Sequence, residues 1–94
     1  MAEEKFTEQK LVRAVKTMGG LALKFITPGY NGVPDRIILL AGGKAAFVEL
    51  KAKGKKMRPL QVKRKRELES LGFSVYCIDN VNQIGEVLSA IQSS

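Results

Sequence analysis

The 94-residue chain contains no histidine and only one cysteine, Cys77. Zinc sites built from these residues and acid–base catalysis by histidine are therefore excluded, and any metal ion must be held by oxygen ligands. A single cysteine cannot form an internal disulfide, and the apolar segment around Cys77 is typical of a small core side chain. This cysteine usage favours a reducing compartment, and we expect a cytoplasmic protein.

Long apolar runs are also missing. No segment approaches the roughly 20 residues of a membrane helix, and no apolar N-terminal segment resembles a signal peptide, so we expect no membrane partner. Hydrophobic residues make up 45% of the chain and charged residues 27%, as is usual for globular proteins. The length suits one small domain, which we assign to residues 1–94.

Positive charge is abundant. Sixteen Lys and Arg against nine Asp and Glu give a net charge of +7, which indicates a polyanionic partner first and an anionic membrane surface second. Nine basic residues and no acidic one lie between positions 51 and 66, a block too long and too one-signed to favour a merely solvated helix face. The predicted phosphate contacts are Lys53, Lys55, Lys56, Arg58, Lys63, Arg64 and Arg66, and Tyr30 is a further candidate that suits turn filling equally well.

Hydrophobic periodicity and turn residues predict the order αβββαβα. The first helix is expected to have Thr7 as its N-cap, with Phe6 packed on Leu11, and to end at the glycine pair 19–20. Strands are expected at 21–27, 36–40, 45–51 and 73–79, the second of them central in its sheet. Further helices are predicted between Pro59 and Gly72 and after Asn80, with Gln83 completing a capping box. This is a single α/β domain with a mixed sheet flanked by helices.

The candidate site lies on the hairpin through Gly42 and Gly43. Asp35 opens one arm, while Glu49 and Lys51 stand two apart on the other and so share one face of the strand. Mg²⁺-assisted hydrolysis of a phosphodiester needs carboxylate ligands and a group that serves the attacking water, which these three residues can supply. Taken alone, an acid–lysine pair on a strand is more often a solvated ion pair, but here it interrupts an otherwise apolar hairpin.

The hairpin sets a geometric condition for this site. A strict two-residue turn at Gly42-Gly43 would place Asp35 opposite Leu50, so that its side chain would leave by the wrong face. A three-residue loop with a bulge would instead place it opposite Glu49. We therefore predict an irregularity at Gly42-Gly43 or at the Pro34 end.

Two further residues are candidates from their positions in helices. Glu8 lies near the inward face of the first helix and could complete a metal shell, although it could equally well complement the helix dipole. Gln61, in the first turn of the second helix, could hydrogen-bond the site or a phosphate, although a solvated polar role is the commoner one at such a position.

In combination these residues resemble a known nuclease family. Glu8, the segment Gly32-Val33-Pro34-Asp35-Arg36, the segment Val48-Glu49-Leu50-Lys51 and Gln61 occur in the order seen in the virus-type replication-repair nuclease domain, VRR-NUC, a branch of the PD-(D/E)xK nucleases. The resemblance implies a restriction-endonuclease-like core. It also implies a Mg²⁺ or Mn²⁺ site made by Asp35, Glu49 and the backbone carbonyl of Leu50, with Glu8 as a further ligand, Lys51 serving the water and Gln61 supporting the site.

The resemblance also implies what the protein acts on. Stand-alone members of this length resemble archaeal Holliday-junction resolvases, so we expect a metal-dependent DNA endonuclease that cuts branched, four-way DNA as a homodimer. Two alternatives remain open. One is a non-catalytic module that binds nucleic acid through the basic block, and the other is a nicking or flap-cutting nuclease that acts as a monomer.

Overall fold

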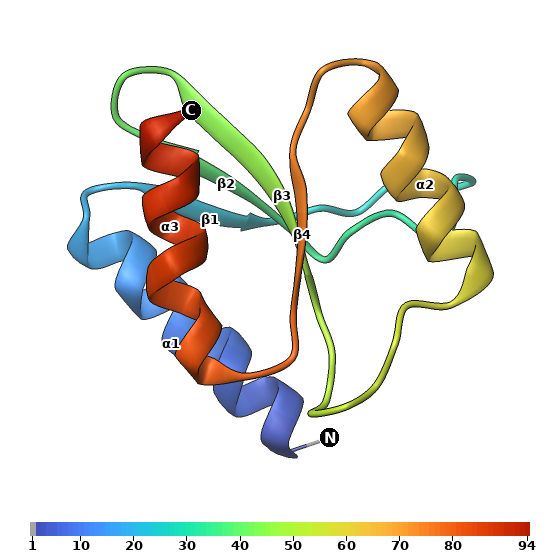
Figure 1. Cartoon of the computed structure of the whole chain (residues 1–94), viewed down its shortest axis with the longest axis horizontal. Helices are drawn as coiled ribbons and strands as arrows, with labels where there is room; N and C mark the ends of the chain where they lie inside the picture. Colours follow the sequence, from blue (N-terminus) through green and yellow to red (C-terminus); the bar gives the residue numbers. More distant parts are fainter. Residues whose placement is uncertain (1) are drawn as a thin grey trace.

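The computed structural model describes residues 2–94 and has the predicted order of elements. Three helices, α1 (Ala2–Thr17), α2 (Pro59–Ser70) and α3 (Ile84–Ser93), surround strands β1 (Leu21–Lys24), β2 (Arg36–Leu40), β3 (Lys44–Leu50) and β4 (Val75–Ile78) (Figure 1). In the part of the chain that is described, no helix is both long and apolar enough to cross a membrane.

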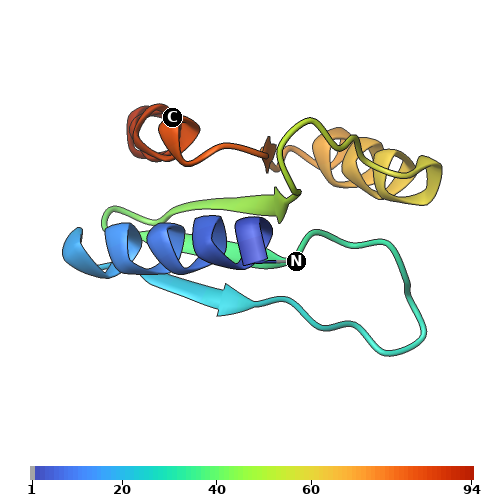
Figure 2. The same cartoon turned by 90° about the horizontal axis from the view of Figure 1, so that it is seen from below.

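The four strands form one mixed sheet in the order β1-β2-β3-β4. The first three pair antiparallel and β4 pairs parallel to β3, so β2 is central, as predicted. Helix α1 lies along the strands in Figure 2, and Figure 1 shows α1 and α3 on one side of the strands and α2 on the other. The sheet therefore has one face covered by α1 and α3 and another that only α2 covers.

The first helix begins earlier than the sequence pattern indicated. Thr7 was expected to cap it, but Thr7 lies within α1 and its hydroxyl donates to the carbonyl oxygen of Glu3. The acidic residues of the first turn are Glu3 and Glu4, which suit the positive end of the helix dipole. Phe6 is half exposed, with the Lys10 ammonium over its ring, and does not act as the expected staple.

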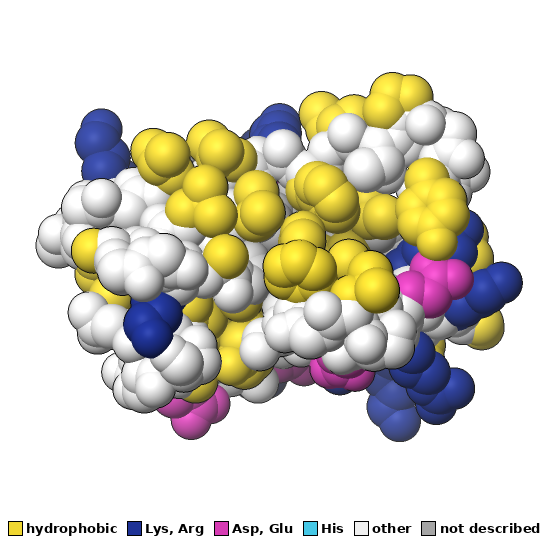
Figure 3. Space-filling model, turned by 90° about the horizontal axis from the view of Figure 1, so that it is seen from above, with side chains coloured by type: hydrophobic (Ala, Val, Ile, Leu, Met, Phe, Trp, Pro, Cys, Tyr) yellow, Lys and Arg dark blue, Asp and Glu magenta, His cyan; other side chains and the backbone are white. Residues whose placement is uncertain are grey.

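The sheet face that α2 covers remains partly open. Apolar side chains on and beside it are exposed to water, namely Leu21, Leu23, Ile26, Leu71 and Phe73. We call these five residues the open face. Figure 3, which looks onto the side of the sheet away from α1, shows hydrophobic side chains gathered there. No residue of α2 is fully buried, because this helix covers only part of the sheet face.

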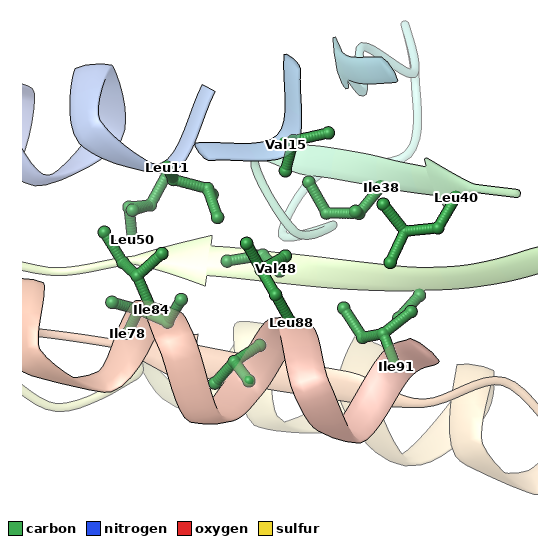
Figure 4. Packing of buried hydrophobic residues seen from close by; sticks show 12 residues of the cluster. Leu11, Val15, Ile38, Leu40, Val48, Leu50, Ile78, Ile84, Leu88 and Ile91 are labelled. Carbon is green, nitrogen blue, oxygen red and sulfur yellow. The ribbon is translucent and has the colours of Figure 1, made fainter. Parts of the chain in front are cut away.

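The core lies on the other face of the sheet. Leu11 and Val15 of α1 meet Ile38 of β2 and Val48 of β3, and all four are fully buried. The predicted apolar stripe of the last helix, formed by Ile84, Val87, Leu88 and Ile91, closes this cluster (Figure 4). The predicted capping box is also present, since the Asn80 side chain accepts from the Asn82 N–H and that of Gln83 accepts from the Asn80 N–H.

Candidate active site

The hairpin register brings the two acidic residues together. Leu40 pairs with Lys44 and Arg36 with Val48, which leaves a three-residue loop of Ala41, Gly42 and Gly43. Continuing the same register sets position 35 opposite position 49. The predicted three-residue loop is confirmed, and both glycines adopt the left-handed conformation with φ of +84° and +74°. The ladder itself is continuous, so the register is achieved without the expected bulge.

Glu49 is a buried carboxylate whose two oxygen atoms differ. Its side chain is 2% exposed. Oε2 lies 3.1 Å from the Lys51 ammonium and accepts a 2.7 Å hydrogen bond from Gln61 Nε2. Oε1 is buried without any hydrogen-bond partner, alone in this respect among the side-chain polar atoms of residues 2–94. Because an unpaired buried oxygen of this kind is costly, it marks the place where a cation would be stabilising.

The surroundings of Glu49 disfavour its charged form. Burial, then the negative charges of Asp35 and Glu4, raise the pKa of Glu49 to about 7, against the opposing effect of Lys51. Ionising Glu49 in the folded protein therefore costs free energy, and a bound cation would offset that cost. Cys77, which pairs with Glu49 in the neighbouring strand, responds similarly, since burial raises the pKa of its thiol and disfavours a reactive thiolate.

Asp35 and Gln61 are each held by a backbone group. Oδ2 of Asp35 accepts a 2.8 Å hydrogen bond from the N–H of Leu50, which ties the start of β2 to the end of β3. Oε1 of Gln61 accepts from the N–H of Arg58 at the start of α2, while its Nε2 reaches Glu49. We call Asp35 and Glu49 the acidic pair. Gln61 joins α2 to this pair, as expected of a group that orients Glu49.

Comparison with known proteins identifies this arrangement. No model of a known protein family matches the chain. A solved structure described as a VRR_NUC domain has a TM-score of 0.86 at 24% identity, over 93% of this chain and 95% of that one. A relative named "Putative nuclease p44", from Acyrthosiphon pisum secondary endosymbiont phage 1, is 40% identical over 91 residues, or 97% of both chains.

The chain belongs to a nuclease family and has the fold of the VRR-NUC domain.

One residue of the expected VRR-NUC site lies elsewhere. The Glu8 carboxylate forms a 2.9 Å ion pair with Nε of Arg36, whose side chain leaves β2 on the face opposite that of Asp35. Residues 2–94 contain no cluster of three or more Asp, Glu, His or Cys side chains that could hold a metal ion. The expectation that Glu8 joins Asp35 and Glu49 as a ligand therefore stays a prediction, and in this structure the partner of Glu8 is Arg36.

The carboxylate of α1 whose charge is felt by Glu49 is Glu4. Its charge contributes to the raised pKa of Glu49, and it lies seven residues before the buried Leu11 on the same side of the helix. The sequence signal was present, since the inward spacing continues from Leu11 back to Glu4. It was missed because the helix was expected to begin at Thr7.

The basic block of this VRR-NUC chain divides into free and engaged side chains. Most of the predicted phosphate contacts are exposed, and within residues 2–94 they form no ion pair: Lys53, Lys55, Lys56, Arg58, Lys63 and Arg66. They lie on the loop after β3 and on α2, directly after Lys51. A polyanion bound along them would therefore pass close to the acidic pair.

Arg64 and Tyr30 make contacts within the protein. The Arg64 guanidinium lies 3.7 Å from the centre of the Tyr30 ring, donates to the carbonyl oxygen of Asn31 and pairs with Glu67. The Tyr30 hydroxyl also donates to Glu67. These contacts hold the loop before Asp35 against α2, so the two side chains predicted to contact nucleic acid are engaged within the protein.

Proposed function

We propose that this VRR-NUC protein is a Mg²⁺- or Mn²⁺-dependent endodeoxyribonuclease. Its active site, formed by Asp35, Glu49 and Lys51, hydrolyses phosphodiester bonds of DNA. The unpaired Oε1 of Glu49 carries the proposal. A fully buried carboxylate with one oxygen satisfied and the other free is a costly arrangement in a purely structural ion pair, and it suits a cation ligand.

The donors at this site fit a hard divalent cation. Asp35 and Glu49 supply carboxylate oxygens, and the backbone carbonyl of Leu50, next to the N–H that Asp35 holds, is the proposed third ligand. When bound, the ion would polarise the phosphate and favour ionisation of the attacking water. Glu8 is left out of this set because Arg36 engages it.

Lys51 and Gln61 have separate roles in the proposal. The Lys51 ammonium lies beside Glu49 and can hold the attacking water or stabilise the negative charge that develops on the phosphate. Gln61 donates to Oε2 of Glu49, which keeps that oxygen occupied and leaves Oε1 for the ion. Burial of these side chains excludes bulk water and strengthens their electrostatic effects.

A cleavage assay tests this function. Wild type and Lys51→Ala are incubated with labelled four-way junction, flap and linear duplex DNA, each with Mg²⁺, Mn²⁺ or EDTA. We expect the wild type to cut the four-way junction preferentially and only with metal, and Lys51→Ala to be inactive. Cutting in EDTA, or equal cutting by both proteins, would contradict the mechanism. Salt-sensitive binding without any cutting would instead support a non-catalytic nucleic-acid-binding module.

We also propose that two copies associate through the open face. Its five apolar side chains are each at least 45% exposed, and exposed apolar side chains that lie together often mark an interaction surface. The net charge of +7 opposes self-association, but the free cations of the basic block lie on the loop after β3 and on α2, away from the exposed leucines of β1. A two-fold interface between like chains is also the commonest kind of oligomer.

The dimer is tested by measuring molar mass in solution. We expect a dimer for the wild type and a monomer for Leu23→Lys or Phe73→Lys, with loss of paired cuts on a four-way junction. Val81→Lys, which changes an exposed apolar residue outside the open face, is the control and should remain a dimer. A monomeric wild type that nicks or cuts flaps would contradict the proposal.

A further inference from the structure

A second basic surface lies outside the block at 51–66. A groove of about 670 Å³ runs between α1 and the edge of the sheet at β1. Its charged lining residues are Lys5, Glu8, Arg13 and Lys16 of α1, Lys24 of β1 and Arg36 of β2. We call this hollow the α1–β1 groove. It contains five cationic side chains and one carboxylate, so a bound anion would be favoured over a cation.

Four of these cations have no role within the fold. Lys5, Arg13, Lys16 and Lys24 are exposed, and none forms an ion pair in the part of the chain that the structure describes. Arg36 differs, because it pairs with Glu8 and also donates to the carbonyl oxygen of Ala22, which fastens the base of the groove. At the base of the groove the Arg36 side chain is therefore held in place, while the cations along its sides are exposed and can bind an anion.

The groove and the acidic pair lie at the same end of the sheet but on opposite faces. Asp35 and Arg36 are consecutive, and their side chains leave the strand in opposite directions. Lys24 pairs with Arg36 in the register of β1 and β2, so it too points to the face of α1. The acidic pair is thus flanked by free cations on both sides of the sheet, with the basic block on one side and the groove on the other.

A straight duplex lying along the basic block would not enter the groove, because the sheet and α1 separate the two surfaces. A branched nucleic acid sends arms in different directions and can reach both. The lining residues of α1 from Lys5 to Lys16 extend over about 16 Å, a length along which one strand of B-form DNA carries about five phosphates.

We propose that the α1–β1 groove binds the phosphate backbone of a second arm of a branched DNA substrate, while the basic block holds the arm that is cut. This inference rests on the proposed nuclease function and adds the feature that makes the protein prefer branched substrates. The contacts are electrostatic and made to phosphates, so they select DNA shape and carry no base preference.

Binding in EDTA tests the groove without cutting. Affinities of wild type, Arg13→Gln, Lys16→Gln and the double variant are measured by fluorescence anisotropy for a four-way junction and a linear duplex of equal length, at several salt concentrations. We expect the double variant to bind the junction on the order of tenfold more weakly and to reduce the salt slope by about 2, with little change on linear duplex. Lys44→Gln, which removes the same charge at the far end of the hairpin, is the control and should match the wild type.

Two outcomes would overturn the proposal. One is an equal loss of affinity for junction and linear duplex in the double variant, and the other is no loss on the junction. The fate of the nuclease proposal is read separately, from metal-dependent cutting by the wild type. A wild type that binds the junction through Arg13 and Lys16 but never cuts it would uphold the groove and contradict the nuclease function.

Discussion

Two acid–base pairs lie at the same end of the sheet, on opposite faces, and they differ in what surrounds them. In the pair of Glu49 and Lys51 the carboxylate is almost completely buried and one of its oxygens has no partner. In the pair of Glu8 and Arg36 the carboxylate is 28% exposed, so water can complete its hydrogen bonds. Keeping Glu49 charged therefore costs free energy, whereas water can stabilise the charge on Glu8.

The contrast separates a chemical role from a structural one. A short ion pair is common to both, so distance alone does not identify the active one. Burial, the unpaired oxygen and the raised pKa occur together at Glu49. If this difference decides which pair is catalytic, variants of the two pairs should behave differently.

The rate of cutting should depend strongly on the pair of Glu49 and Lys51 and hardly at all on Glu8 of the other pair. Glu49→Gln and Lys51→Ala should each lower the rate of cutting by at least 10²- to 10³-fold, on the order expected for losing one charged group from an active site. Glu8→Gln should change it by less than about twofold. Single-turnover rates on a four-way junction measure both, and thermal unfolding confirms that the variants fold. An equally large loss in Glu8→Gln would erase the distinction.

In metal-free buffer, the stability of the folded protein should decrease as the pH rises, because of Glu49. A carboxyl whose folded pKa is raised from 4.5 to about 7 contributes stability that is fully present below 4.5 and is lost as pH rises through about 7. The loss amounts to at most about 3 kcal/mol of unfolding free energy. In urea unfolding with EDTA, Glu49→Gln should therefore gain on the wild type between pH 5 and pH 8. Parallel curves would mean that Glu49 carries its charge without cost.

Metal ions should stabilise the folded protein through Asp35 and Glu49. At pH 8, Mn²⁺ at about 100 times its dissociation constant would add about 2.7 kcal/mol, seen as a rise in melting temperature. We expect this rise in the wild type and in Glu8→Gln, and its loss in Glu49→Gln and Asp35→Asn. Loss of the shift in Glu8→Gln would return Glu8 to the metal shell.

The pair of Glu8 and Arg36 should contribute little to stability. A double-mutant cycle with Glu8→Gln and Arg36→Gln should give a coupling of about 1 kcal/mol or less, as is usual for partly exposed ion pairs. The cycle also cancels the separate hydrogen bond of Arg36 to Ala22. A coupling near 3 kcal/mol, the range of buried pairs, would show that the two pairs are alike.

The sequence was sufficient for the fold and for the acidic pair because both depend on local periodicity. Alternating residues along the hairpin and the requirement that Asp35 meet Glu49 predicted a three-residue loop, which the register confirms. The order of elements and the last capping box follow from equally local signals.

Side-chain pairing across long sequence separations could not be predicted in the same way. Arg36 lies 28 residues from Glu8, and Tyr30 lies 37 residues from Glu67. Nothing in a one-dimensional pattern distinguishes a basic residue that binds a phosphate from one that binds a distant carboxylate. For this reason the contacts that Glu8, Arg64 and Tyr30 make within the protein were not predicted.

The loop at Ala41 to Gly43 has a consequence for how the gene can vary. Strand side chains alternate, so removing one residue here shifts the register by one and turns Asp35 from Glu49 toward the opposite face. Removal of a single glycine would leave a well-formed hairpin and a folded protein that has lost its acidic pair. What matters is therefore whether the number of residues added to or removed from this loop is odd or even. Insertions of two residues should be tolerated better than insertions of one.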